Sequence, residues 1–272
     1  MLNIIVSVFI AIFSAPAMAG ASDCVAYVKR VYGSSVPIET SHGAILAIGI
    51  AHVPHRRLIA LAEDLVKKCS GYSLMVESFE GLTPVEAEYY RQEAAKVYRA
   101  ASEEKLTLIS RIVKGTVDAA AIGLEADLVL GELSADQKLL RLGLDAGYSV
   151  YRLEGPSDAL RALLQIPKEH LETLARDAED NVRENGDAIR SLLDRLFSGD
   201  WEFLENFYRN SCNRDVAHST LCERMIRDRN EAFARAVCGN RTSATNSLVI
   251  VGGMHLLGPH SLQRKIGELC GY

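Results

Sequence analysis

The chain has 272 residues, of which 48% are hydrophobic and 24% are charged. This length and composition are typical of one globular domain with a large buried core. The formal net charge is −5, and lysine and arginine are not concentrated in a patch that would neutralise phosphates. Nucleic acid is therefore disfavoured as a partner.

Residues 1 to 19 are predicted to be a secretory signal peptide. Leu2 to Phe13 is almost wholly apolar, and Ala17-Met18-Ala19 has the small-x-small pattern that precedes signal-peptidase cleavage. No lysine or arginine precedes the apolar run, so an uncleaved anchor is the alternative, but the run is short for a membrane-spanning helix, which needs about 20 residues. We expect an exported mature chain, periplasmic or secreted, with no stable membrane span.

All six cysteines lie after the expected cleavage site, and an even number in an exported chain is typical of disulfides. Their spacings match no zinc-binding pattern, so a structural zinc site is the weaker interpretation. Three pairs each flank one predicted element. On that ground we expect the disulfides Cys24 with Cys69, Cys212 with Cys222, and Cys238 with Cys270.

The predicted elements begin with a β-α-β unit. Short apolar runs at residues 43 to 53 and 72 to 78 are bounded by Gly, Ser and Pro, which is typical of buried strands. Between them, Leu58, Ala62 and Leu65 have the spacing of an amphipathic helix.

From Thr83 to about residue 198 the chain is predicted to be mostly helical. It opens with a capping box, in which Thr83 is the N-cap, Pro84 the first helical residue and Glu86 the reciprocal partner. Residues 147 to 164 add one more strand, a Gly-Pro turn and the start of a helix.

A last helix at about residues 217 to 238 precedes a final buried strand within residues 246 to 258. Strands near both ends of the chain with helices between them predict an α/β fold. Its central sheet is built from N- and C-terminal strands, with a large helical insertion at about residues 83 to 200. We expect residues 20 to 272 to form a single domain.

Two of the predicted strands end in the same pattern, Gly-x-x-His. The first runs from Gly49 to His52 and the second from Gly252 to His255, and each is followed by a proline and a second histidine, His55 and His260. In open α/β sheets, ligands bind beyond the carboxyl ends of the strands. His52 and His255 are therefore expected at one ligand site.

A third strand end supplies carboxylates. The strand within residues 72 to 78 ends at Glu77, with Glu80 three residues later. Two imidazoles and a carboxylate are the ligand set of a catalytic divalent-metal site that leaves one position open for water. We predict His52, Glu77 and His255 as metal ligands, although each alone has a structural or solvent-facing alternative. The set suits zinc, manganese and cobalt alike.

An arginine lies on the apolar side of the last predicted helix. Leu221, Met225, position 229 and Phe233 recur at helical intervals, so Arg229 projects from the inward face. Its stem could instead cover that face while its head reaches solvent. In the functional interpretation, the guanidinium points into the site, where it holds a ligating carboxylate or stabilises an anionic transition state.

These motifs together resemble the TraB/GumN family, also called TraB/PrgY/TIKI, and its bacterial GumN-like branch. The resemblance rests on Gly-x-x-His after an early strand, the strand-end Glu77, the Arg229-Asn230 pair and the closing sequence VGGMHLLGP, and it covers nearly the whole mature chain. It implies an α/β core related to erythromycin-esterase-like (EreA) and ChaN-like folds. It also implies a divalent-metal site lined by His52, His255, Glu77 and Arg229, with Asn230 beside them.

The chain departs from that family at His55 and His260, where a small polar residue such as Asp is usual. These imidazoles could crowd the site, relay a proton or face solvent. The resemblance leaves the substrate open, because the family includes animal metal-dependent proteases, proteins tied to peptide-pheromone control and GumN-like proteins without an established activity.

We therefore expect an exported metal-dependent hydrolase that acts on a peptide or small-molecule substrate, with peptide bonds the first class to test. Glu80 would act as general base, and Arg229 would stabilise the oxyanion. The chain contains neither an HExxH helix nor a G-x-S-x-G elbow, which excludes the common zincin and serine-hydrolase arrangements. One alternative is a non-catalytic binder that sequesters a peptide or haem-like ligand in the same cleft. Another is a degenerate member whose strand-end residues only brace the fold.

Overall fold

The computed structural model describes residues 21–32, 37–40, 43–52, 54–77, 84–125, 127–129, 133–240 and 246–271. The predicted signal peptide, the predicted helix cap Thr83 and the predicted base Glu80 lie outside the described residues.

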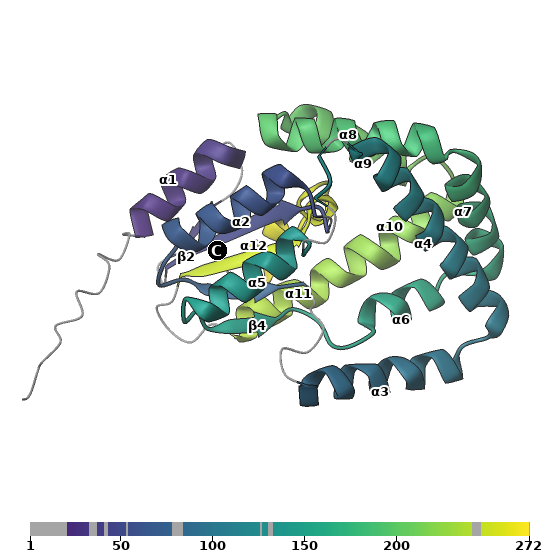
Figure 1. Cartoon of the computed structure of the whole chain (residues 1–272), viewed down its shortest axis with the longest axis horizontal. Coiled ribbons are helices and arrows are strands. Elements are labelled where there is room, and N and C mark those ends of the chain that lie inside the picture. Colours follow the sequence, from purple (N-terminus) through teal and green to yellow (C-terminus); the bar gives the residue numbers. More distant parts are fainter. Residues whose placement is uncertain are drawn as a thin grey trace, which may run out of the picture.

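The centre of the molecule is a five-stranded sheet with the order β1-β2-β5-β3-β4. Its strands are β1 (Pro37–Thr40), β2 (Gly43–Ile50), β3 (Ser73–Val76), β4 (Val150–Arg152) and β5 (Ser247–Gly252). Strand β1 pairs antiparallel with β2, and all other pairs are parallel. The first and last predicted strands are thus neighbours at the middle of the sheet, which confirms the predicted α/β fold (Figure 1).

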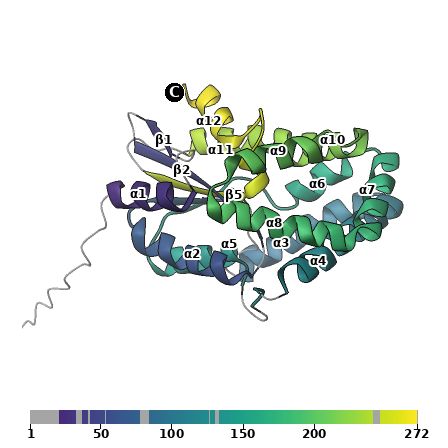
Figure 2. The same ribbon diagram turned by 90° about the horizontal axis from the view of Figure 1, so that it is seen from above.

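Helices cover both faces of the sheet because its central strands are apolar on both sides. Leu46 and Ile48 of β2 pack in a cluster with helices α1 (Ala21–Tyr32), α2 (Arg56–Lys68) and α5 (Ala135–Asp145). Alternate residues of the same strand point the other way. Ile45 and Ala47 pack with α11 (Asp228–Gly239) and α12 (Leu262–Cys270). Figure 2 shows the resulting three layers.

The remaining helices form an arm beside the sheet (Figure 1). They are α3 (Pro84–Ala100), α4 (Glu103–Leu124), α6 (Asp158–Leu164), α7 (Lys168–Asp180), α8 (Val182–Ser198), α9 (Trp201–Cys212) and α10 (Val216–Cys222). The predicted helical insertion is confirmed, and β4 lies inside it as predicted. The helical arm also continues beyond residue 200, through α9 and α10.

Helices α4 and α8 approach unusually closely where two glycines face each other. A Cβ added at Gly123 would lie 2.2 Å from the carbonyl oxygen of Gly186. Gly123→Ala is therefore expected to lower the free energy of unfolding by about 1–3 kcal/mol, because the helices must separate. Gly239→Ala is the matched control, since nothing lies within 4 Å of its added Cβ and alanine favours helices by about 0.5–1 kcal/mol.

Urea unfolding of the two glycine variants measures this difference. Equal stability of both variants would show that α4 and α8 can part at no cost, contrary to the tight packing described above.

The three predicted disulfides are confirmed. Cys24 bonds Cys69, Cys212 bonds Cys222 and Cys238 bonds Cys270. The first ties α1 to the end of α2, and the third ties α11 to α12, the two helices of one sheet face. Within the described ranges, no helix is long and apolar enough to cross a membrane.

Candidate functional site

Four parallel strand ends converge on one cluster of polar residues. His52 follows β2, Glu77 follows β3 and Glu154 follows β4, whereas His255 lies in a short 3-10 helix, η3 (Gly253–Leu256), directly after β5. The strand register places these ends at one edge of the sheet, because Ile50 pairs with Gly252 and Val76 pairs with both Ile250 and Arg152. The predicted residues His52, Glu77 and His255 therefore lie together.

Glu77 is the centre of the cluster. Its Oε2 accepts hydrogen bonds from the backbone N–H of Gly252, at 2.7 Å, and lies 3.2 Å from Nε2 of His52. Its Oε1 accepts from Nη2 of Arg229 at 2.5 Å and lies 3.6 Å from Nε2 of His255. Burial opposes the negative charge, but the contacts with His255, His52 and Arg229 outweigh it and hold the pKa of Glu77 well below its usual range.

Arg229 links Glu77 to a second buried carboxylate. Its Nε and Nη2 donate to the two oxygens of Glu154 at 3.0 and 2.8 Å, a bidentate pair. Its Nη1 contacts the Met225 carbonyl at 3.3 Å and Nε2 of His255 at 3.5 Å. Each guanidinium nitrogen therefore already has a partner within the protein. This geometry favours the role of holding Glu77 over that of binding a developing oxyanion.

Burial raises the pKa of Glu154, and the neighbouring Arg229 opposes that shift. Sequence reasoning did not select Glu154. Glu154 has the same sequence feature that indicated Glu77, namely a carboxylate just after a short predicted strand. In this case Gly155 follows it.

Asn230 fixes the orientation and tautomer of His255. Its Nδ2 donates to two backbone carbonyls, those of His255 at 3.0 Å and His260 at 2.8 Å. The side-chain oxygen of Asn230 must therefore face Nδ1 of His255, at 2.6 Å, and this nitrogen carries the proton. Burial lowers the pKa of His255, and the contact with Glu77 opposes that shift. Nε2 of the ring is directed at Glu77.

Asp136 plays a similar part for His52. Its Oδ2 lies 3.2 Å from Nδ1 of His52, which leaves Nε2 of that ring directed at Glu77. Partial burial disfavours the imidazolium, but Asp136 and Glu77 outweigh it and raise the pKa of His52 to about 10. Asp136 was missed by sequence reasoning. It lies in the first turn of α5, between the two residues of a capping box, Ser134 and Gln137.

A π-helical turn, η2 (Glu223–Arg227), joins α10 to α11 and directs both members of the Arg-Asn pair inward. Arg229 and Asn230 are buried, with 9% and 0% of their surface exposed. The predicted inward projection of Arg229 is thus seen in the structure. Such turns contain one residue more than an α-helix needs, and they are frequent at functional sites.

A family comparison bears on the same residues. The chain matches the model of the TraB/PrgY/gumN family over residues 60–268, a range that includes Glu77, Arg229 and His255. The chain belongs to the TraB/PrgY/gumN family. No curated protein and no solved structure matches it.

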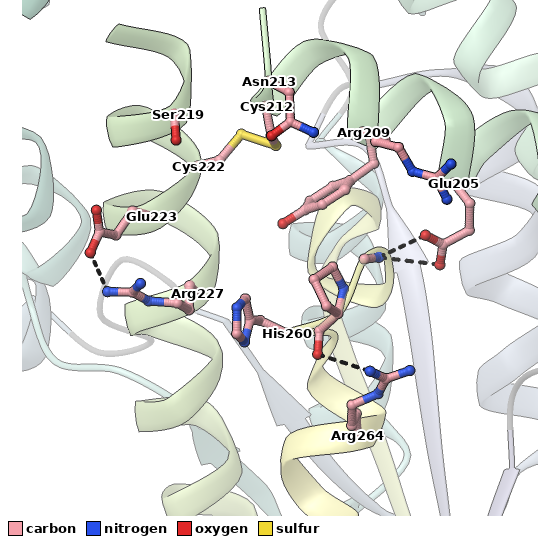
Figure 3. A pocket seen from close by; sticks show the side chains of 13 residues that line it. Glu205, Arg209, Cys212, Asn213, Ser219, Cys222, Glu223, Arg227, His260 and Arg264 are labelled. Carbon is pink, nitrogen blue, oxygen red and sulfur yellow. Dashed lines mark hydrogen bonds and ion pairs between the residues drawn. A yellow bond between two sulfur atoms is a disulfide. The ribbon is translucent and has the colours of Figure 1, made fainter. Parts of the chain in front are cut away.

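The two extra histidines of this TraB/PrgY/gumN chain are not in the cluster. His55 is buried and caps α2, because its Nδ1 accepts from the backbone N–H of Arg57 at 3.2 Å. His260 instead lines a pocket of about 680 Å³ between α9, the π turn and α12 (Figure 3). Only its backbone carbonyl reaches the cluster, through Asn230.

The buried cap His55 is expected to make stability depend on pH. Burial lowers the pKa of His55 in the folded chain, with Asp127 opposing and Arg57 adding to that shift. Between this lowered pKa and the unfolded value of about 6.5, the unfolded chain binds a proton that the folded chain does not. Stability therefore falls as pH decreases below about 6.5, with a slope of at most about 1.4 kcal/mol per pH unit from one group.

His55→Asn keeps a residue suited to an N-cap but removes the titrating ring. Urea unfolding of both proteins from pH 8 to pH 5 should give a shallower decrease for the variant. Parallel curves would show that His55 does not contribute to the pH dependence.

The donor chemistry of the cluster suits a divalent cation, although among the described side chains no group of three His, Cys, Asp or Glu residues is placed to hold one. Both imidazoles have Nδ1 against a fixed acceptor and Nε2 toward the Glu77 carboxylate. Metal-binding histidines characteristically have such a partner on their other nitrogen. By their donor atoms, His52, Glu77 and His255 are therefore the residues that would engage such a cation, and Glu77 is also held by Arg229.

The cluster forms the floor of a large pocket of about 920 Å³. This volume lies within the range of small-molecule sites, about 300–1,000 Å³. The walls come from the helical arm and are mostly apolar side chains. The arrangement can thus place a bond of a bound molecule against the carboxylates and imidazoles of the cluster.

Proposed function

We propose that this chain is an exported metal-dependent hydrolase that cleaves an amide bond, with peptide bonds the first class to test. The observation that carries the proposal is the matched pair of imidazoles. His52 and His255 come from opposite ends of the chain, yet each is held through Nδ1 and directs Nε2 at the same carboxylate of Glu77.

His52, Glu77 and His255 would hold the cation, which when bound supplies a Lewis acid that polarises the scissile carbonyl. Arg229 keeps Glu77 ionised and oriented, and Glu154 in turn fixes Arg229. Asn230 and Asp136 set the ring orientations of the two histidines. Glu80, three residues after Glu77 in the sequence, is the proposed base.

The three disulfides support the proposed export, because such bonds persist in oxidising compartments such as the periplasm. A signal peptide over residues 1 to 19 remains part of the proposal.

A non-catalytic binder is the second candidate, and the apolar walls of the pocket favour it. A metal measurement separates the two. Oxidised protein, stripped with chelator, is offered zinc, manganese and cobalt in turn, and its metal content is compared with that of the His52→Ala/His255→Ala double variant. His170→Ala is the control, since His170 contacts Thr220 rather than the cluster. Circular dichroism confirms that each variant is folded.

About one equivalent of metal in the wild type and the control, with almost none in the double variant, is the expected result. Absence of metal from all proteins after the three ions are offered would overturn the metal-dependent hydrolase and favour the binder. If the variants bound metal like the wild type and lost only stability, the strand-end histidines would merely brace the fold.

A further inference from the structure

The pocket walls are almost continuously apolar along the helical arm. Most of their apolar residues come from four helices of the arm, from the π turn and from η3. The main contributors are Leu163 of α6, Ile189, Leu192, Leu193 and Leu196 of α8, Leu204 of α9, Leu221 of α10, Met225 and Ile226 of the π turn, and Met254 of η3. The backbone N–H and C=O groups of these helices bond within the helices. The walls therefore offer contact area and few hydrogen bonds.

The polar side chains on the walls are already engaged within the protein. The Thr116 hydroxyl donates to the Ile112 carbonyl at 2.9 Å. His218 lies between two carboxylates, with Nδ1 2.9 Å from Asp215 and Nε2 3.4 Å from Asp177.

The same holds on α5, where Gln137 accepts from the backbone N–H of Ser134 at 3.2 Å. Among the described wall residues away from the floor, the Ser211 hydroxyl and the amide N–H groups of Gln137 are left for a ligand. These few groups cannot pair all the N–H and C=O groups of an extended peptide, and each such group buried without a partner costs about 1–3 kcal/mol.

We propose that the pocket binds a linear acyl or alkyl chain, so that the substrate is an amide or peptide that carries a long apolar chain next to the scissile bond. A hydrocarbon chain gains from contact with apolar walls and has no polar group to satisfy. This inference deepens the proposed function and names the substrate class of the same site.

The pairing of the charged side chains at the floor favours a neutral head group. Arg229 is paired with Glu77 and Glu154, and His52 contacts Glu77 and Asp136. Neither basic side chain is therefore free to pair with the carboxylate of a fatty acid. An N-alkyl amide brings an uncharged dipole there instead.

Binding of N-methyl alkanamides from six to twelve carbons tests this proposal without any catalysis. Calorimetric titration uses the metal-free, oxidised protein, so that loss of the proposed hydrolase activity would not affect the outcome. Affinity should rise roughly threefold to fourfold per added methylene, the factor expected when each CH₂ group is buried. The blocked peptide acetyl-Leu-Leu-Leu-amide, of similar apolar size, should bind more weakly than the longest amide.

Leu163→Trp fills the pocket from α6, and Leu160→Trp is the matched control on the same helix. Both residues pack against the core of the helical arm, but Leu160 does not line the pocket. Leu192→Trp on α8 provides a second blocking variant in case one is unfolded. Loss of amide binding by at least tenfold in the folded blocking variants, with the control unchanged, supports the proposal. Affinity independent of chain length, or tighter binding of the tripeptide, overturns it.

Discussion

Arg229→Met is expected to lower the free energy of unfolding by about 3–5 kcal/mol, the usual cost of removing one partner of a buried ion pair. The guanidinium contacts both Glu77 and Glu154, and the side chains of all three residues are nearly buried. Methionine fills a similar volume but leaves two carboxylates without their cation. Urea unfolding at neutral pH measures the loss.

Arg235→Met is the control on the same helix. Arg235 is exposed and, among the described residues, pairs with Glu231, one turn away, so the control should change stability by less than about 0.5 kcal/mol. Adding Glu154→Gln to Arg229→Met should recover part of the loss, because one unpaired charge is removed. A loss no larger than that of the control would show that the two carboxylates do not depend on Arg229.

Asn230→Ala is expected to cost about 2–4 kcal/mol, because it leaves two buried groups and one partly buried group without the hydrogen bonds that Asn230 makes. These are Nδ1 of His255 and the carbonyls of His255 and His260. Asn206→Ala, at an exposed position of α9, is the control. Stability is compared by urea unfolding as for Arg229.

A second measurement separates this role from a general loss of packing. Nitrogen chemical shifts of the His255 ring should report a proton on Nδ1 in the wild type and a mixture of tautomers in the variant. An unchanged tautomer in a folded Asn230→Ala protein would contradict the assigned role of Asn230.

The core of the site could be predicted from the sequence because its residues follow short apolar runs. His52, Glu77 and His255 each come directly after such a run, and parallel strands bring those ends together. Asp136 could not be found in that way, since it lies on a helix and reaches His52 only in the folded chain. Its place depends on the packing of α5 beside α2.

The repeated Pro-His ending does not give the two histidines the same place in the structure. Pro54-His55 and Pro259-His260 are alike in sequence, but the chain turns differently after each strand. The first histidine begins a helix as its cap. Before the second, Gly258 has a φ of +79°, which favours glycine, and the chain then directs His260 into the other pocket.

The π turn before Arg229 also could not be read from the sequence. A regular helix would place Met225, Arg229 and Phe233 on one inward face, as the spacing predicts. In the structure Ile226 is buried and Met225 is only half-buried, because the wider turn shifts the face by one residue. No residue type in that segment marks such a turn.

That additional residue divides one long helix into two halves that serve different tasks. The half before it contributes Leu221 to the pocket wall, whereas the half after it supplies Arg229 and Asn230 to the cluster. Deleting one residue from the turn would rotate the halves by about 100° relative to each other. Relatives that keep the Arg-Asn pair but lack the additional residue are therefore expected to share the charged groups while accepting a different range of substrates.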